Sequence, residues 1–227
     1  MQGTHSLADI EVLAGLAADQ RAGIVADCRW RSVERGSQIL SAQTESTDVF
    51  FLTRGRVRVT IYSPSGREVA FRDLGPGASF GELAAIDGQS RSASVVALDE
   101  CVLATISRER FWRLIEASPA VAAHVMRSLT ALVRDLTARV VDTTTRTVPQ
   151  RVRAEVVRLA REAGVADNSA SIGRFPVHAD LANHIGATRE AVTRELGRLA
   201  REGLIERRGG RLLVHDVDAL IAVIGDM

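Results

Sequence analysis

The sequence predicts an α+β protein in which a β-rich N-terminal half is followed by a helical C-terminal half. Between residues 32 and 107, short segments with apolar residues at alternate positions are separated by turns, which is typical of a sandwich or barrel. From Val125 to Val140, apolar residues instead repeat every three or four positions, as on a helix face. Residues 179–202 then contain two helical segments around a glycine turn, which predicts a helix-turn-helix.

Composition places the 227-residue chain among ordinary soluble proteins, with 46% hydrophobic residues, 25% charged residues and a net charge of +1. We find no membrane-length apolar run and no signal-peptide pattern at the N-terminus, so we predict a cytoplasmic protein with no membrane partner. Cys28 and Cys101 are too few for a thiolate zinc site or an iron–sulfur cluster, and the five histidines lack ligand spacing. We therefore expect no metal and no catalytic residue.

The N-terminal half begins with helical patterns. Apolar residues from Leu7 to Ala17 predict an amphipathic helix, and residues 19–28 predict a second, shorter one. Strands and turns follow. The expected strands are 32–40, 48–52, 57–61, 68–74, 93–97 and 101–107, with turns at 54–56, 64–66 and 75–77.

A long helix is expected to follow a short one at residues 108–116. Ser118 suits its N-cap and Pro119 its first turn. Its apolar positions lie close to a heptad pattern, which predicts a partner helix, with packing against the chain's own barrel as the alternative. The poor helix formers at 142–145 predict an interdomain hinge. The seam positions are Val125, Leu129, Leu132, Leu136 and Val140.

The segment Phe80–Ala93 combines groups that suit a nucleotide. Gly81 lets backbone approach a ligand closely, and Arg91 can fork onto phosphate oxygens with a further hydrogen bond from Ser92. Glu82 has the wrong charge for phosphate and suits sugar hydroxyls. One phosphate and one sugar together predict a nucleotide ligand; a hairpin with a surface Arg and a capping Ser is the alternative.

An overlapping motif, Gly77-Ala78-Ser79-Phe80-Gly81, fits the nucleophile elbow of α/β-hydrolases. That elbow should follow a buried strand, whereas this one follows the turn sequence Leu74-Gly75-Pro76. No acid/base pair or metal cluster accompanies it. We therefore predict that the protein is not an enzyme, and a hydrolase remains the remote alternative.

The C-terminal half predicts a DNA-reading module. After a helix at 151–162, a polar loop at 164–171 and a short strand at 175–177, two helices at 179–185 and 188–202 flank Gly186-Ala187. Thr188 suits the N-cap of the second helix, and a glycine-containing hairpin at 204–214 predicts a wing before a last helix at 217–224. The shared core is expected at Ile185, Val192, Leu196 and Leu199.

The first turns of the second helix carry side chains that suit base edges. Arg189 and Arg194 can take guanine, Glu190 can accept from cytosine, and Thr193 can contact a thymine methyl group or a phosphate. Residues 188–211 hold seven Arg against four Glu, a local charge of +3 in a near-neutral chain. This balance favours a specific reader of double-stranded DNA over a nonspecific coat.

Two segments carry a family resemblance. The segment Phe80–Ala93, called the cassette below, resembles the phosphate-binding cassette of cyclic-nucleotide-binding domains. Residues 179–202 resemble the helix-turn-helix of CRP/FNR (catabolite-activator-type) regulators. The resemblance implies an eight-stranded jelly roll (1–117), a dimerisation helix (118–141), a hinge (142–147) and a winged helix-turn-helix (148–227). It implies a homodimer, with RNA polymerase as a further partner. The cassette residues are Gly81, Glu82 and Leu83, followed by Arg91, Ser92 and Ala93.

The same resemblance implies the ligand, a cyclic purine mononucleotide effector rather than a prosthetic group. In the family, the cassette holds the cyclic phosphate and the ribose. The positions that contact the purine in the family's cAMP receptors fall on Leu136 and Thr137, so one of two hydroxyls is lost. Ser92, where cGMP-preferring relatives often carry Thr, favours cAMP. The expected effector is cAMP first and cGMP second.

For DNA, the resemblance implies that Arg189, Glu190 and Arg194 read a half-site with a TGTGA-like core. Thr193 departs from the small residue of the catabolite-activator pattern and is similar to the anaerobic-regulator branch. His178 is expected near a phosphate, with a plain surface histidine as the alternative. Two rival classes stay open. One is a family member that regulates transcription without nucleotide control. The other is a redox or haem sensor on the same scaffold, although this sequence lacks the thiols that such a sensor uses.

Overall fold

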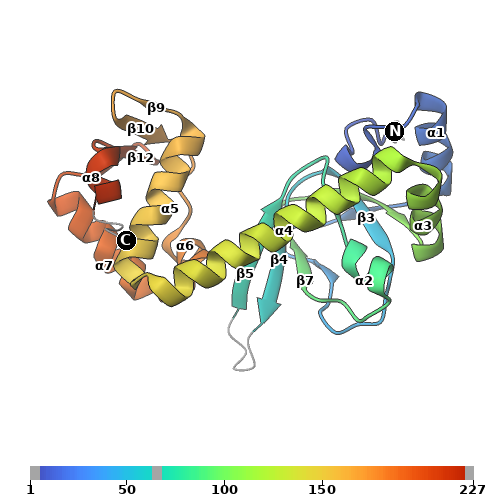
Figure 1. The fold of residues 1–227 in the computed structure, drawn as a ribbon, viewed down its shortest axis with the longest axis horizontal. Coiled ribbons are helices and arrows are strands. Elements are labelled where there is room, and N and C mark those ends of the chain that lie inside the picture. The colour runs from blue at the N-terminus through green and yellow to red at the C-terminus, as the bar shows by residue number, and fades with distance from the viewer. Residues whose placement is uncertain (1–5, 63–67, 223–227) are drawn as a thin grey trace. The chain divides into compact units, whose positions relative to one another are not determined.

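The computed structural model describes residues 6–62 and 68–222 (Figure 1). The chain divides into two compact units, Met1–Val133 and Arg134–Met227, and each has its own hydrophobic core. The first unit is rich in strands and the second in helices. This distribution confirms the predicted α+β class.

The first unit is a sandwich of two antiparallel four-stranded sheets, with strand orders β1-β8-β3-β6 and β2-β7-β4-β5. Eight strands in the described residues fit the expected jelly roll. Their bounds are β1 Arg29–Val33, β2 Gln38–Leu40, β3 Val49–Arg54, β4 Val57–Tyr62, β5 Glu68–Leu74, β6 Ser79–Phe80, β7 Ser94–Ala97 and β8 Cys101–Ile106.

Strand β3 lies between two cores, because successive side chains of a strand point to opposite faces. Phe50 belongs to the core that includes Val57 of β4. Its neighbour Phe51 belongs to a second core that includes Phe111 and Val121 from the helices. Both faces of this strand are therefore buried, and it reads as a continuous apolar run rather than an alternating one.

The amphipathic helix predicted at the N-terminus is wrong. A 3-10 helix, η1 (Glu11–Leu13), takes its place between turns, and α1 (Ala18–Asp27) follows where the second helix was expected. The apolar residues are buried as the pattern suggested, including Leu7, Ile10 and Leu13. The helix-like spacing of these apolar residues reflects their burial and not an α-helix. Short turns and a 3-10 helix can also direct every third side chain toward a core.

Two further expectations for strands and loops need correction. The single strand 32–40 is interrupted by a turn, where Gly36 adopts φ +83°, a conformation that favours glycine. The loop expected at 164–171 is a hairpin of β9 (Val165–Ala166) and β10 (Ser169–Ile172). Asp167 and Asn168 make its turn at φ 48° and 59°, which these residues tolerate.

No strand forms at 175–177, where Pro176 lacks the N–H that a ladder needs. The turn expected at 64–66 and the end of the last helix lie outside the described residues.

Helix α3 (Arg108–Ala117) leads directly into α4 (Pro119–Thr145), the long helix drawn from green to yellow in Figure 1. Ser118 caps α4 as expected, because its hydroxyl accepts a hydrogen bond from the Val121 amide at 3.4 Å. Val121 and Val125 are buried in the sandwich core, so the first turns of α4 pack against their own unit.

Helix α4 continues through the segment expected to break it. The hydroxyls of Thr143, Thr144 and Thr145 donate to carbonyls four residues earlier at 2.8, 2.8 and 2.7 Å. The segment is helical to Thr145, and each of these three hydroxyls has an acceptor within the helix. The backbone leaves the helix only at 146–147, and a hinge function at 142–147 stays a prediction.

The second unit packs helices against a small sheet with strand order β11-β12-β10-β9. Its core holds residues from the helices α5 to α8 and from the strands β10 to β12, including Val156, Leu181 and Val192, and all four predicted core positions are buried. The wing turns at Gly209 and Gly210, both at positive φ, as the glycine pair predicted. The elements are α5 Val148–Ala163, α6 His178–His184, α7 Arg189–Arg201, β11 Ile205–Arg208, β12 Arg211–Val214 and α8 Val217–Ala222.

Candidate functional site

Arg91 is the buried centre of the predicted cassette, with 3% of its surface exposed. Its Nε donates to the Ser46 hydroxyl at 3.0 Å, Nη1 to the Gly81 carbonyl at 2.8 Å and Nη2 to the Asp48 carbonyl at 2.7 Å. The guanidinium also lies 5.8 Å from the ring centroid of Phe50. Arg has five N–H donors, so these bonds leave two for a ligand.

Gly81 is required beside this guanidinium. It adopts φ +88°, and a Cβ there would lie 2.7 Å from Arg91 Nη1 and 2.9 Å from the Asp48 carbonyl. The turn opens into α2 (Glu82–Asp87), which directs Glu82 toward the interior. The structure thus brings Gly81, Glu82 and Arg91 together, as the cassette predicted.

Burial acts on both charges of the cassette. It lowers the pKa of Arg91, while Asp48 and Glu82 act to raise it, and the guanidinium keeps its charge. Burial raises the pKa of Glu82, while its own backbone N–H, Arg72 and Arg91 act to lower it. Glu82, whose side chain is 16% exposed, is therefore a partly buried carboxylate within the electrostatic reach of two guanidinium groups.

Glu82 lines a cavity of about 120 Å³ in the first unit. The cavity mixes apolar and polar walls, which suits a ligand with a flat ring and polar edges. Its apolar lining includes Leu74, Phe111, Val125 and Leu129, and its polar lining includes Arg72, Ser79, Glu82, His124 and Ser128.

Sequence reasoning assigned one of these polar residues, Glu82, to a ligand, noted Ser79 only in the hydrolase-like motif, and missed the others. Arg72 lies on β5, and its position follows from strand register, which the sequence does not give. The remaining cassette residues do not line the cavity: Leu83 and Ala93 are half-buried and Ser92 is exposed. Their contacts with a ligand stay predictions.

Leu136 and Thr137 lie on α4 within the second unit, and both side chains are exposed. Their predicted contact with a purine stays a prediction. Leu136 belongs to a row of exposed apolar side chains on α4. The others are Met126, Val133 and Val140, which lie seven positions apart and are 62%, 61% and 61% exposed.

This exposed row corrects the predicted seam. Val125 is buried, and Leu129 packs against the same sandwich core, so these two serve the chain's own unit. The exposed row keeps the predicted positions Leu136 and Val140, but it continues through Val133 and Met126 instead of Leu132, Leu129 and Val125. A heptad pattern does not distinguish two neighbouring stripes when both are apolar.

Helix α7 presents the predicted DNA-reading residues. Arg189, Glu190, Thr193 and Arg194 are all exposed on its first turns. Thr188 is the N-cap, because its hydroxyl accepts from the Ala191 amide at 3.3 Å. The side chains on the first turns of this helix are therefore open to solvent and can reach a base edge.

His178 contacts this face through Thr193, since its Nδ1 lies 2.8 Å from the Thr193 hydroxyl. Burial lowers the pKa of His178, and Arg207 and Arg189 lower it further. The imidazole is therefore neutral at pH 7 and orients Thr193. The expected phosphate contact of His178 stays a prediction.

A buried ion pair holds α7 from behind. Arg153 of α5 donates from Nε to Glu195 at 2.8 Å, and their side chains are only 4% and 6% exposed. Arg198 also donates to Glu195, at 3.0 and 2.8 Å. Sequence reasoning counted Glu195 only in the charge balance, because nothing in the pattern marks a buried carboxylate.

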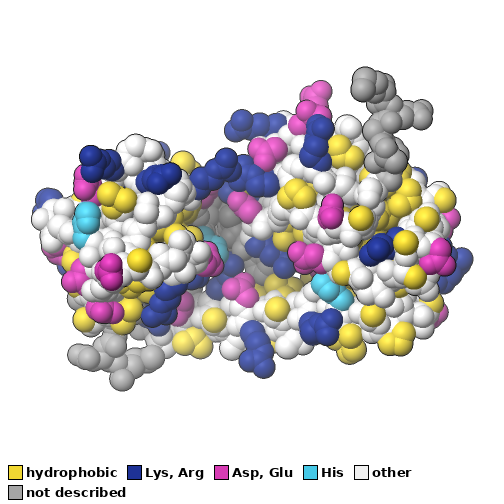
Figure 2. Space-filling view, turned by 90° about the horizontal axis from the view of Figure 1, so that it is seen from above, with side chains coloured by type: hydrophobic (Ala, Val, Ile, Leu, Met, Phe, Trp, Pro, Cys, Tyr) yellow, Lys and Arg dark blue, Asp and Glu magenta, His cyan; other side chains and the backbone are white. Residues whose placement is uncertain are grey.

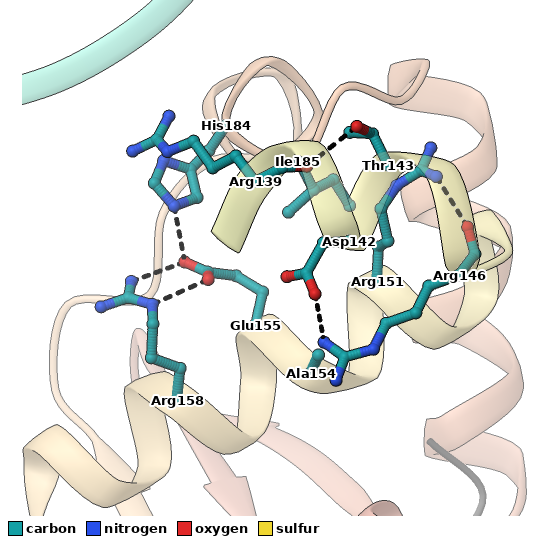
Figure 3. A pocket seen from close by; sticks show the side chains of 10 residues that line it. All are labelled: Arg139, Asp142, Thr143, Arg146, Arg151, Ala154, Glu155, Arg158, His184 and Ile185. Carbon is teal, nitrogen blue, oxygen red and sulfur yellow. Dashed lines mark hydrogen bonds and ion pairs between the residues drawn. The ribbon is translucent and has the colours of Figure 1, made fainter. Parts of the chain in front are cut away.

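A second cavity, of about 240 Å³, lies in the second unit between the end of α4, α5 and α6 (Figure 3). Its charged groups bind one another. Arg146 pairs with Asp142 at 2.7 Å, and Arg158 pairs with Glu155 at 2.6 Å. Arg151 donates to the carbonyl of Arg146 at 2.8 Å and to that of Gly186, at the helix-turn-helix corner, at 3.2 Å.

Across the surface, Arg side chains are intermingled with Asp and Glu on the face drawn in Figure 2. Within residues 6–62 and 68–222, no helix is long and apolar enough to span a bilayer. The same residues contain no cluster of three or more groups that would hold a metal ion.

Comparison with known proteins identifies both halves. A family model described as a cyclic nucleotide-binding domain matches residues 30–118, and a Crp-like helix-turn-helix domain matches residues 150–223. The chain is 28% identical over 220 residues to the cyclic AMP receptor protein of Thermus thermophilus, covering 95% of this chain and 93% of that protein.

Two further likenesses extend over most of the chain. The cAMP-activated global transcriptional regulator CRP of Haemophilus influenzae is 24% identical over 189 residues, covering 83% of this chain and 84% of that protein. The fold matches a mutant of CooA from Carboxydothermus hydrogenoformans with a TM-score of 0.81 at 19% identity, covering 98% and 97% of the two chains. The chain belongs to the CRP/FNR family of DNA-binding transcription regulators.

Proposed function

We propose that the protein is a homodimeric transcription regulator whose DNA binding responds to a cyclic purine mononucleotide. The observation that carries this proposal is the buried guanidinium of Arg91, held against the Gly81 turn beside the cavity that Glu82 lines. The names of two relatives, a cyclic AMP receptor protein and a cAMP-activated global transcriptional regulator, support the same class of effector.

The chemistry of binding follows from the donors that remain. Arg91 has two N–H groups beyond those it gives to the protein, and they can bond the anionic oxygens of a cyclic phosphate. Ser92 is exposed at the same turn and can add a hydroxyl donor. Glu82 accepts from the ribose hydroxyl, which gives its buried carboxylate a partner.

The proposed dimer uses the exposed row of α4. Met126, Val133 and Val140 recur every seven residues, and Leu136 lies on the same face. Such a row exposes apolar surface unless a second helix covers it, and a parallel copy of α4 has the matching pattern. A second copy of this chain is therefore the occupant that the sequence period fits.

Ligand control of DNA binding follows from linkage. A nucleotide that interacts differently with two arrangements of the dimer shifts the population toward one of them. Two α7 helices must enter successive major grooves about 34 Å apart, so only one arrangement binds a palindromic operator well. In each half-site, Arg189, Glu190 and Arg194 are the proposed base-reading residues.

The test is calorimetric titration of the full chain with cAMP and with cGMP. Arg91→Ala removes the proposed phosphate contacts and is expected to weaken binding by about a hundredfold or more. Arg54→Ala is the matched control, because Arg54 belongs to the same sandwich and only makes an exposed pair with Glu100. Thermal melting of both variants shows whether the sandwich is still folded.

Wild-type protein that binds neither nucleotide at high micromolar concentration would overturn the proposal. Undiminished binding by Arg91→Ala would overturn the role of Arg91.

A second candidate is a family member that regulates without a nucleotide. The observation that favours it is that three protein acceptors already engage Arg91. Gel shifts with and without nucleotide separate the two, since a constitutive regulator binds its operator equally in both. A cytoplasmic location, a contact with RNA polymerase and the lack of catalysis stay predictions in either case.

A further inference from the structure

We infer that Arg72 reads the base of the ligand and selects guanine over adenine. The inference rests on the proposed nucleotide site and deepens it. It reverses the order expected from the sequence, in which Ser92 favoured cAMP.

The first observation is an unsatisfied donor. Arg72 lies on β5 and lines the cavity, and its side chain is 38% exposed. Its Nε is buried and has no hydrogen-bond partner among the residues that the structure describes. Its Nη2 lies 3.9 Å from Glu82, too far for a hydrogen bond. A buried donor without an acceptor is costly, so this geometry suits a ligand that supplies one.

The second observation is which charged groups line the cavity. Arg72 and Glu82 both line it, and Arg91 does not. A cyclic nucleotide presents its phosphate, its ribose and its base in that order. With the phosphate at Arg91 and the ribose at Glu82, a base that continues into the cavity meets Arg72.

The cavity agrees with this placement. At about 120 Å³ it is smaller than the roughly 300 Å³ that encloses a whole ligand of this size, so it takes only part of the nucleotide. Phe111, Val125 and Leu129 offer apolar contact to a ring, and Ser79 and Ser128 offer hydroxyls to its edge.

The guanidinium then decides between the two purines. Arg carries donors and no acceptor. Guanine presents two acceptors side by side, O6 and N7, which match the fork of Arg. Adenine presents N7 beside an amino group that is itself a donor, so one arm of the fork would face a donor. A bidentate contact of this kind discriminates by roughly tenfold to a hundredfold.

A phosphate contact for Arg72 fits less well. A phosphate at Arg72 would carry its negative charge next to the Glu82 carboxylate, whose Oε1 lies 3.9 Å from Arg72 Nη2. The oxygen and nitrogen edge of a neutral base avoids that repulsion.

The experiment is calorimetric titration of the full chain with cGMP, cIMP and cAMP. Cyclic IMP keeps O6 and N7 but lacks the 2-amino group, so it isolates the edge that Arg72 would read. Wild-type protein should bind cGMP and cIMP about tenfold or more tighter than cAMP. Arg72→Met should weaken cGMP and cIMP by about tenfold or more and change cAMP by less than about threefold.

Two further variants make the result specific. Arg72→Lys keeps the charge beside Glu82 but loses the planar fork, so it should keep the fold and still lose the preference. Arg54→Met, in the exposed pair with Glu100, should leave all three affinities unchanged.

Wild-type protein that prefers cAMP, equal losses for all three nucleotides in Arg72→Met, or a preference restored by Arg72→Lys would each overturn the inference and leave the proposed function standing. Binding of none of the three would overturn both.

Discussion

Replacing Arg153 by Met tests how the DNA-reading helix is held. The substitution keeps most of the side-chain volume but leaves the Glu195 carboxylate, 6% exposed, without its buried partner. Removing one member of a buried ion pair costs about 3–5 kcal/mol. Arg198 still donates to Glu195 and is 42% exposed, so part of the charge stays compensated. We therefore expect a loss of about 2–3 kcal/mol in the free energy of unfolding of the second unit.

The two units can be followed separately. Both tryptophans, Trp30 and Trp112, lie in the first unit, so their fluorescence reports its unfolding. Far-UV circular dichroism reports both units. In urea, Arg153→Met should shift the unfolding of the second unit to lower urea concentration. Circular dichroism detects this transition, and tryptophan fluorescence does not. The fluorescence transition of the first unit should stay where it is in the wild-type protein.

Two further proteins complete the test. Arg153→Met combined with Glu195→Leu removes both charges and should recover most of the lost stability, because no unpaired buried charge remains. Arg201→Met is the control on the exposed side of α7 and should change stability by less than about 0.5 kcal/mol. A loss below about 1 kcal/mol in the single variant, or a double variant as unstable as the single one, would refute this account of the ion pair.

Three other predictions follow from exposed or perturbed groups. Arg194→Ala should remove about 1–3 kcal/mol of discrimination between operator and mutated half-sites in gel shifts while nucleotide still binds, and unchanged discrimination would contradict a base contact. Val133→Glu puts a charge into the exposed row and should give a monomer by light scattering, whereas Ala131→Glu should stay dimeric; a dimeric Val133→Glu would exclude this seam. Burial raises the pKa of the Cys28 thiol to about 11, so its thiolate fraction is only about 0.1% at pH 8. The rate at which a thiol reagent labels Cys28 should therefore be low at pH 8 and should rise about tenfold per pH unit up to pH 10. Rapid labelling at pH 8 would point instead to a redox-active thiol.

The sequence predicted the elements whose local chemistry is decisive. Gly81 and Gly209 mark turns that only positive φ allows, Ser118 and Thr188 cap their helices, and the core of the helix-turn-helix is buried where its period placed it. Turns and caps depend on residues close in the chain, so they can be predicted from the sequence alone.

Features set by tertiary contacts were missed or misplaced. The first part of the row on α4 was misplaced, because Val125 and Leu129 pack in the sandwich core and the adjacent exposed stripe is also apolar. Arg72 and Glu195 were not identified from the sequence, because only strand register and helix packing bring one to the cavity and bury the other. The hairpin at Asp167-Asn168 looked like a polar loop, since its strands are two and four residues long.

Arg151 gives the protein a mechanical property. Its guanidinium ties the last carbonyls beyond α4 to the corner between α6 and α7, through Arg146 and Gly186. A displacement at the end of α4 would therefore pull on the corner of the helix-turn-helix through a single side chain. Shortening this one side chain removes both hydrogen bonds, so the end of α4 would lose this tie to the corner of the helix-turn-helix.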